Sequence, residues 1–520
     1  MSLGKRISTV GGFTLLSRVF GFIRDMLMAR YLGAGMASDA FFIAFKLPNF
    51  FRRLFAEGAF SVGFVPLYSR LLGKELTPES KAAADAFAGQ VLSWLLPILL
   101  IFLAIMEAAM VPVMLGLSGG FEGDAEKLNL TVELGRYTFP YLVLISLMTF
   151  FTGMLNAVDR FSAAAFAPVI LNLCMITALI GFGETEVEKA RYLAGAVSLS
   201  GLAQLMWVFV AARRAGLNVS LPRPKLSPEV RELFRVIGPA ALGAGIVQIN
   251  LLIDVLLAAR FLPEGSVSWL FYADRLNQLP LGVIGVAVGT VLLPGISRLL
   301  AGGDESGATR QQNRAIEISL FLTLPSAVAL ALIASPIIAT LFERNAFTEA
   351  DTAATAAALV VYALGLPAYV IAKALTPGYF ARKDTKTPVR FATISLVINT
   401  GLNLVLIWDF AHVGLALATA IAAWVNVIML YVGLKGRYGF TLARRTWVSA
   451  LKCLLACGVM AATLLAYTHF FGAMFDADGS ARILHLVLMI AAGGTSYLIV
   501  AVLTRAIDTG EIGTILRGRR

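Results

Sequence analysis

Long apolar stretches separated by short polar breaks run along the whole chain. A helix needs about 20 consecutive apolar residues to cross the hydrocarbon core of a bilayer, so a chain of 520 residues has room for about fourteen crossings. The pattern therefore predicts an all-α polytopic membrane protein. The predicted spans cover residues 9–31, 38–70, 87–117, 134–156, 163–183, 191–212, 235–261, 267–299, 315–342, 353–379, 389–408, 412–434, 446–471 and 482–504.

The composition agrees with this class and excludes several others. Hydrophobic residues make up 58% of the chain and charged residues only 14%, which is more apolar surface than a soluble protein could bury. The chain lacks a GxxxxGK[ST] phosphate-binding loop, so we expect no ATP hydrolysis. Its three cysteines lie in apolar segments and its three histidines are scattered. We therefore predict a polytopic membrane protein without a cofactor, and neither an enzyme nor a nucleic-acid binder.

The basic residues are distributed unevenly between alternate connections. One set, which includes both termini, holds 27 of the 43 lysines and arginines, whereas the alternate set holds 8 and is richer in acids. Positively charged connections face the cytoplasm. Both termini are therefore predicted to be cytoplasmic, as an even number of spans requires.

Two halves of the chain resemble each other. "ARYLGAGMASDAFF" at 29–42 aligns without a gap on "ARFLPEGSVSWLFY" at 259–272, and 65–72 resembles 293–300 at nearly the same offset. Six spans separate the copies, which predicts a parallel duplication related by an axis along the membrane normal. Chance similarity between apolar helices is the alternative. The predicted parts are two six-helix lobes at 1–220 and 221–440, followed by spans 13 and 14 with the tail at 441–520.

Eight basic residues fall inside the apolar stretches. A lipid-facing cation near the middle of a bilayer costs about 2.5–3.5 kcal/mol. We therefore expect these residues to line a hydrated cavity or to pair with acids, except Lys452, which lies near the start of its span and can extend to the cytoplasmic headgroups. The five candidate acids are too few to neutralise them, although buried ion pairs that organise the fold remain an alternative. The basic residues are Arg18, Arg24, Lys46, Arg52, Arg53, Arg275, Lys373 and Lys452, and the acids are Asp25, Glu57, Glu107, Asp254 and Asp274.

An excess of arginines in a cavity indicates an anionic ligand. Guanidinium groups bind phosphate through planar, bidentate donors, so several of them suit a diphosphate. In "FKLPNFFRRLFAEG", Pro48 and Asn49 precede Arg52 and Arg53, and Glu57 follows Arg53 by one helical turn. The two adjacent arginines lie about 100° apart on a helix, so the sequence leaves open which of them faces the cavity.

Three segments carry a resemblance to one family. They are "SRVFGFIRD" (17–25), "SDAFFIAFKLPNFFRRLFAEGAFSVGFVPLYSR" (38–70) and "FYADRLNQLPLGVIGVAVGTVLLP" (271–294). They resemble the MurJ (MviN) lipid II flippases of the multidrug/oligosaccharidyl-lipid/polysaccharide exporter superfamily, and the resemblance covers essentially the whole chain. It implies transport of lipid II, the undecaprenyl-diphosphate-linked MurNAc-pentapeptide-GlcNAc precursor of peptidoglycan, from the inner to the outer leaflet of the bacterial inner membrane.

The resemblance also implies site residues and partners. The lipid tail is expected beside spans 13 and 14, among membrane lipids, and contacts with the cell-wall synthesis machinery are implied. The implied substrate-binding residues are Arg18, Arg24, Asp39, Arg52 and Arg275, with Asn49, Arg53 and Glu57 close by.

The chain departs from the family pattern at two places. Gln278 stands where some members have an acid, so no acid acts there. Some members bind sodium through oxygen ligands, and that pattern implies a weaker site here, because Asn403 replaces an acid; interhelical hydrogen bonds are an equal alternative. The implied ligands are Asp254, Asn399, Asn403 and Thr419.

Because no ATP hydrolysis is expected, the candidate energy sources for transport are a sodium gradient, a proton gradient and the membrane potential. A flippase for another prenyl-diphosphate-linked glycan fits the same residues. A drug or cation antiporter fits them less well, because its cavity would be acidic or aromatic.

Overall fold

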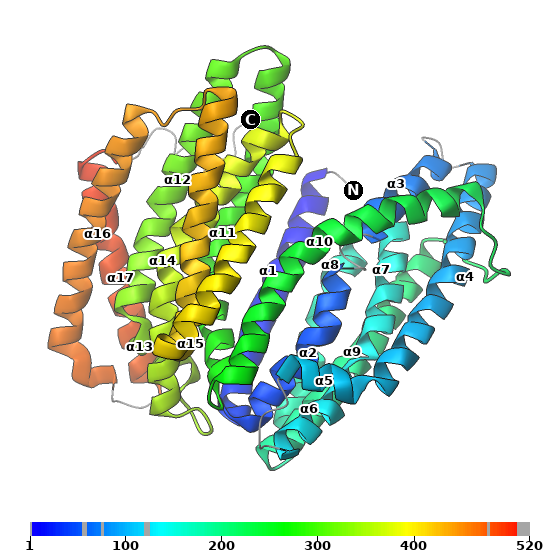
Figure 1. Ribbon diagram of the computed structural model, residues 1–520, viewed down its shortest axis with the longest axis horizontal. Helices are drawn as coiled ribbons and strands as arrows, with labels where there is room; N and C mark the ends of the chain where they lie inside the picture. Colours follow the sequence, from blue (N-terminus) through cyan, green and yellow to red (C-terminus); the bar gives the residue numbers. More distant parts are fainter. Residues whose placement is uncertain (1–2, 55–59, 74–76, 119–124, 476–478, 507–520) are drawn as a thin grey trace. The chain divides into compact units, whose positions relative to one another are not determined.

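The computed structural model describes residues 3–54, 60–73, 77–118, 125–475 and 479–506, and within these ranges all regular structure is helical (Figure 1). This confirms the predicted all-α fold. Glu57 lies outside the described residues. The chain divides into two compact units. Unit 1 is Met1–Ser268 with Arg344–Phe347, and unit 2 is Trp269–Glu343 with Thr348–Arg520.

Unit 1 contains the helices from the N-terminus to the middle of the chain. They are α1 (Leu3–Leu32), α2 (Met36–Phe51), α3 (Ser61–Leu72), α4 (Pro78–Ala108), α5 (Met110–Ser118), α6 (Ala125–Thr138), α7 (Tyr141–Ala157), α8 (Ser162–Gly181), α9 (Glu186–Arg214) and α10 (Pro228–Phe261). The next helix, α11 (Ser266–Ala301), begins in unit 1 and continues into unit 2.

Unit 2 contains the remaining helices. They are α12 (Glu305–Leu332), α13 (Ala334–Phe342), α14 (Glu349–Phe380), α15 (Lys386–Tyr438), α16 (Arg444–Phe471), the short 3-10 helix η2 (Gly472–Phe475) and α17 (Ser480–Leu503). The 53-residue α15 is kinked at Ala411, whose φ of 48° and ψ of −131° are not helical. It therefore corresponds to the two predicted spans at 389–408 and 412–434.

Local sequence explains where several helices begin. Thr77, Thr185 and Thr348 each precede a helix and accept a hydrogen bond from the backbone N–H three residues later, and the side chain at that third position bonds back. Such a capping box satisfies two backbone donors that the first turn leaves without partners. These three boxes mark the starts of α4, α9 and α14.

The core of unit 1 is rich in aromatic side chains. Phe64 of α3 is fully buried, stacks on Phe60 with ring centroids 4.9 Å apart, and lies 5.1 Å from the ring of Phe150 on α7. A Cβ atom on Gly153 would lie only 3.0 Å from Phe64, so the absence of a side chain there allows α3 to approach α7. Leu233 of α10 packs into the same cluster.

The core of unit 2 is formed by α11, α12, α14 and α15. Tyr379 of α14 is fully buried, and its hydroxyl donates to the carbonyl of Leu430 on α15 at 2.7 Å. Asn313 of α12 accepts from the backbone N–H of Ala443 and from the hydroxyl of Thr446. These bonds hold the start of α16 against α12.

Among the described residues, nine helical segments are long and apolar enough to cross a membrane by length and composition. One of them is the kinked α15, and another joins α6 to α7. Their outward faces carry large exposed apolar side chains such as Leu451, which is 68% exposed.

The units do not coincide with the predicted lobes. The first helix of the predicted second lobe, α10, packs within unit 1 against α3, α4 and α5. The two units are defined by which helices pack together, whereas the predicted lobes were defined by the internal repeat in the sequence. The lobe boundaries therefore stay a prediction.

Candidate functional site

Arg24 lies in a buried polar cluster between α1 and α8. Its Nη2 atom is 2.7 Å and its Nε atom 3.1 Å from one carboxylate oxygen of Asp25, and its Nη1 atom donates to Oδ1 of Asn172 at 3.0 Å. The amide of Asn172 in turn donates to the carbonyl of Ser17. Arg24 is 8% exposed and Asp25 is 1% exposed. A buried guanidinium needs such partners because its desolvation is costly.

Arg18 differs from Arg24 in its environment. Its side chain is exposed, although it lies on the same helix six residues earlier. A separation of six residues places the two guanidinium groups on different faces of α1. Arg24 is therefore held by unit 1 itself, whereas Arg18 is accessible.

Asp39 is the centre of a second buried cluster, near the start of α2. Its side chain is 2% exposed and lies 3.1 Å from Nζ of Lys127, which is itself only 7% exposed. The carboxylate also accepts from the backbone N–H of Gly265 at 2.9 Å, and from both the N–H and the hydroxyl of Ser268, at 3.0 and 2.7 Å. We call Asp39, Lys127, Gly265 and Ser268 the Asp39 cluster. All four residues belong to unit 1.

The Asp39 cluster contains Lys127, which was not among the site residues predicted from the sequence. Lys127 falls in a connection between predicted spans, so it was expected near the membrane surface. In the structure α6 begins at Ala125, which places Lys127 in its first turn and packs it against α2. This helix begins nine residues before the span boundary predicted at 134, so the apolar pattern did not indicate that Lys127 is helical and buried.

The end of α2 carries the two adjacent arginines. Arg52 is half-buried and its Nε donates to Oδ1 of Asn49 at 3.1 Å, whereas Arg53 is exposed. The helix continues through Pro48 to Phe51 and then widens into a π-type turn at residues 52–54. Such turns occur often at functional sites. The side chains of Arg52 and Arg53 thus differ in burial, as their separation of about 100° requires.

Arg275 lies on α11 in unit 2. It is half-buried, and its guanidinium carbon is 5.1 Å from the centre of the Phe271 ring. One turn away, the amide of Gln278 donates to the carboxylate of Asp274. Gln278, which stands where some members of the family have an acid, therefore binds an acid one helical turn earlier.

The residues implied for sodium are divided between the two units. In unit 2, Nδ2 of Asn399 donates to the hydroxyl of Thr419 at 3.1 Å, and Nδ2 of Asn403 donates to Oδ1 of Asn399 at 3.2 Å. Asp254 belongs to unit 1. The neutral oxygens suit a hard cation, but these side chains already bond to one another across the two halves of α15. The arrangement of Asn399, Asn403 and Thr419 is thus that of interhelical hydrogen bonds, the alternative to a sodium site, and the sodium site stays a prediction.

The structure therefore brings some of the predicted residues into clusters and leaves others apart. Arg24 is joined to Asn172, and Asp39 to Lys127; neither partner was predicted, because each lies more than 80 residues away in the sequence. Within the described residues, no group of three or more His, Cys, Asp or Glu side chains could hold a metal ion. The substrate-binding role of the predicted residues stays a prediction.

Comparisons with known proteins identify the family. The family model described as "Lipid II flippase MurJ" matches residues 28–485. A protein of Rhizobium tropici named "Probable lipid II flippase MurJ" is 42% identical, covering 100% of this chain and 98% of the relative. A protein of Burkholderia cenocepacia named "Lipid II flippase MurJ" is 35% identical, with 92% of each chain covered.

Solved structures agree with this assignment. One described as "Lipid II flippase MurJ, inward closed conformation" superimposes with a TM-score of 0.78 at 27% identity, covering 95% of this chain and 98% of that chain. An inward-facing multidrug resistance MATE family transporter of the MOP superfamily has a TM-score of 0.66 at 16% identity, covering 82% of this chain and 97% of its own, which shows the shared fold alone. The chain is a multi-pass membrane protein and belongs to the lipid II flippase MurJ family.

Proposed function

We propose that this chain moves lipid II from the inner to the outer leaflet of the bacterial inner membrane by alternating access. Membership of the family over residues 28–485 supports the substrate. The guanidinium groups on α1, α2 and α11 support the ligand chemistry, because a diphosphate is the anionic part of this lipid and guanidinium is its best bidentate partner. The disaccharide-pentapeptide and the prenyl tail give the remaining contacts.

The observation that best supports the proposal is that α1 carries two arginines in different environments. Arg24 is buried and fixed by Asp25 and Asn172, while Arg18, on the same helix, is exposed. A helix that only needed to cross the membrane would be more stable without either cation. We assign the diphosphate to Arg18, Arg24, Arg52 and Arg275, and expect Asn49, Arg53 and Glu57 to act beside them.

We further propose that both termini lie in the cytoplasm and that transport draws on the membrane potential or on an ion gradient. Moving one charge through 100 mV provides about 2.3 kcal/mol. Sodium binding by Asp254, Asn399, Asn403 and Thr419 is one candidate for this coupling. The prenyl tail is assigned to the surface of α16 and α17.

The test is complementation of a bacterium depleted of its own lipid II flippase, combined with an assay of lipid II accumulation in the inner leaflet. Wild-type protein should restore growth and prevent accumulation. Arg18→Lys and Arg275→Lys should impair both, because lysine keeps the charge but loses the planar, two-pronged geometry. Arg160→Lys is the matched control, since Arg160 is an exposed arginine in the connection between α7 and α8.

Two results would contradict the proposal. If alanine at all four assigned arginines still supported growth, these residues would not bind the diphosphate. If lipid II did not accumulate on depletion but another prenyl-diphosphate-linked glycan did, the substrate would be that glycan.

A further inference from the structure

A basic surface unrelated to the predicted cavity lies in the segment that joins α9 to α10. Residues 217–227 form no helix and run along α4, and we call them the strap. Side chains of α4 satisfy the strap's backbone groups. Asp85 accepts from the N–H of Asn218 (3.4 Å), Gln90 accepts from the N–H of Lys225 (2.8 Å), Ser93 donates to the carbonyl of Pro222 (2.6 Å), and Trp94 donates to the carbonyl of Lys225 (3.2 Å).

The surface of α4 is shaped to receive the strap. A Cβ atom on Gly89 would lie 2.7 Å from the carbonyl oxygen of Ser220, so the close approach requires a glycine at this position. Asp85, Gly89 and Ser93 are spaced by four residues, as are Gln90 and Trp94, which places the contacts with the strap on one side of the helix. The strap is therefore a fixed part of unit 1, and its outward side chains have defined positions.

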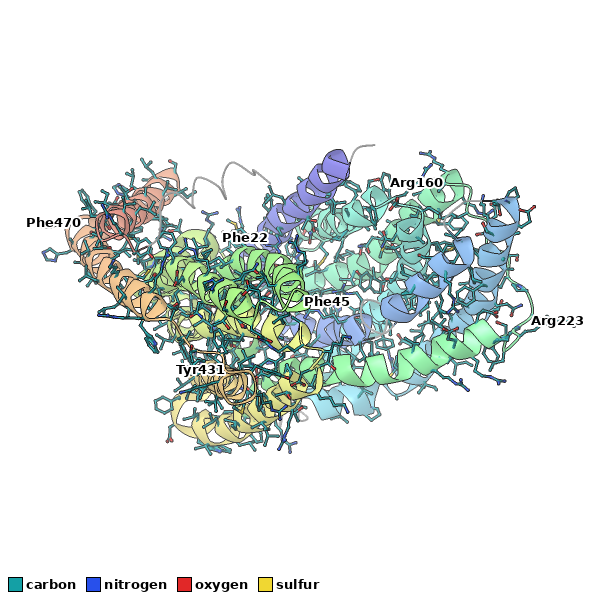
Figure 2. All side chains as sticks on the ribbon, turned by 90° about the horizontal axis from the view of Figure 1, so that it is seen from above. Phe22, Phe45, Arg160, Arg223, Tyr431 and Phe470 are labelled. Atoms are coloured by element: carbon teal, nitrogen blue, oxygen red, sulfur yellow. The ribbon has the colours of Figure 1, made fainter. Side chains whose placement is uncertain are left out.

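Those outward side chains are apolar and cationic. Leu221 and Leu226 are 60% and 49% exposed, and Arg223 and Lys225 are exposed between them. Figure 2 shows Arg223 extending away from the outer edge of the ribbon. The same surface includes exposed basic residues at the end of α9 and the start of α10. Within the described residues, the side chains without an ion pair here are Arg214, Arg223, Lys225, Arg231 and Arg235.

The acids near this surface do not neutralise it. Glu232 is bound to Arg70, with Oε2 2.6 Å from Nη2. Two further acids lie near the strap. Asp85 accepts from the N–H of Asn218 and from the hydroxyl of Tyr68, and Glu229 lies in the first turn of α10, where the helix dipole favours a carboxylate. These two acids are fewer than the five basic residues named above. The strap and its neighbours therefore keep a net positive charge.

The strap lies at the level where α4 changes character. Before Val91 this helix is "PESKAAADAFAGQ", whereas from Val91 it is almost entirely apolar. A change from polar to apolar along a membrane-spanning helix marks the boundary between headgroups and hydrocarbon. The indole N–H of Trp94 bonds to the strap at this boundary, which is where tryptophans of membrane proteins concentrate.

We propose that the strap binds the headgroups of anionic phospholipids in the adjoining leaflet. Leu221 and Leu226 enter the upper acyl region, the planar fork of Arg223 binds a lipid phosphate, and Lys225 adds a second charge. Charge complementarity with an anionic leaflet favours this occupant over a neutral one, and each basic residue near such a surface strengthens binding about fivefold. The choice of leaflet rests on the proposed orientation, in which this connection is cytoplasmic.

The test uses the full-length protein purified with equimolar phosphatidylglycerol and phosphatidylcholine, and native mass spectrometry to count the lipids that each molecule retains. Wild-type protein should retain phosphatidylglycerol in preference. In Arg223→Gln/Lys225→Gln the ratio of phosphatidylglycerol to phosphatidylcholine should fall about 25-fold. The charge-exchanging variant Arg223→Lys/Lys225→Arg should keep most of the preference, and its folded yield controls for damage to the strap.

Arg160→Gln/Arg310→Gln is the matched control, because both arginines are exposed and lie outside the strap. An equal fall in this control would overturn the proposal, since any loss of charge would then suffice. Unchanged retention in the glutamine variant would also overturn it and leave a soluble acidic partner as the occupant. The assay contains no lipid II, so its failure and the failure of the proposed transport function are separate results.

Discussion

Replacing Lys127 by methionine would leave the carboxylate of Asp39 buried without its cationic partner. Both side chains are less than a tenth exposed, and their charged atoms lie 3.1 Å apart. Removing one partner of a buried ion pair costs about 3–5 kcal/mol. Asp39 would keep three hydrogen bonds, from Gly265 and Ser268, so we expect a loss at the lower end, about 3 kcal/mol in the free energy of unfolding.

The measurement is denaturant unfolding of the purified protein in detergent, followed by tryptophan fluorescence. Lys435→Met is the control, because Lys435 is exposed and forms no ion pair among the described residues; it should change stability by less than about 0.5 kcal/mol. The double variant Lys127→Met/Asp39→Asn removes both charges and should recover most of the loss, since replacing both partners is often nearly neutral.

Lys127→Met, Asp39→Asn and the double variant form a cycle that isolates the interaction between the two residues. We expect a coupling energy of about 2 kcal/mol. A loss below about 1 kcal/mol for Lys127→Met, or strictly additive effects in the double variant, would show that the two charges do not depend on each other.

Three further predictions use the same protein. Asn172→Leu removes the amide that joins α1 to α8 and should lower the free energy of unfolding by about 1–3 kcal/mol in the same assay; an unchanged value would contradict the bonding described. Gly201→Ala places a Cβ atom 2.7 Å from Cδ2 of Tyr141 and should cost about 1–3 kcal/mol, whereas no cost would mean that α7 and α9 can separate. The pKa of Asp304 lies below its ordinary 3.8, first because its carboxylate accepts from the backbone N–H of Gly307. The ionised carboxylate of Asp304 therefore stabilises the start of α12 above about pH 4, and this stabilisation is lost as pH falls through the lowered pKa. Hydrogen exchange of the backbone amides at the start of α12 should rise at low pH in the wild type but not in Asp304→Asn. Equal exchange in the two proteins would refute this role of Asp304.

Apolar periodicity predicted the helices well because a bilayer imposes both length and composition on each span. The break predicted between 408 and 412 coincides with the kink at Ala411 in α15. The predicted block at 38–70 instead contains two helices, α2 and α3. Pro48 does not end α2, since the helix continues to Phe51. The apolar pattern thus indicated the interruption of α15 but not the division of the block at 38–70 into two helices.

The partners of the buried charges could not be predicted. Asp25 was a candidate acid because it falls inside an apolar stretch, and it forms an ion pair with Arg24. Asn172 and Lys127 gave no comparable signal, since a single sequence does not reveal which distant residues meet in space. Their roles follow only from the packing of α8 on α1 and of α6 on α2.

The bonds to Asp39 also differ in how strongly they constrain evolution. Lys127 and the hydroxyl of Ser268 contribute side-chain groups, and a change in either alters the bonding. The N–H of Ser268 is a backbone group that every residue except proline would supply. Correlated substitutions across homologues should therefore link position 39 with position 127. The hydrogen bond from the backbone N–H of residue 268 to Asp39 would produce no such correlation, even if it stabilises the protein as much as the ion pair does.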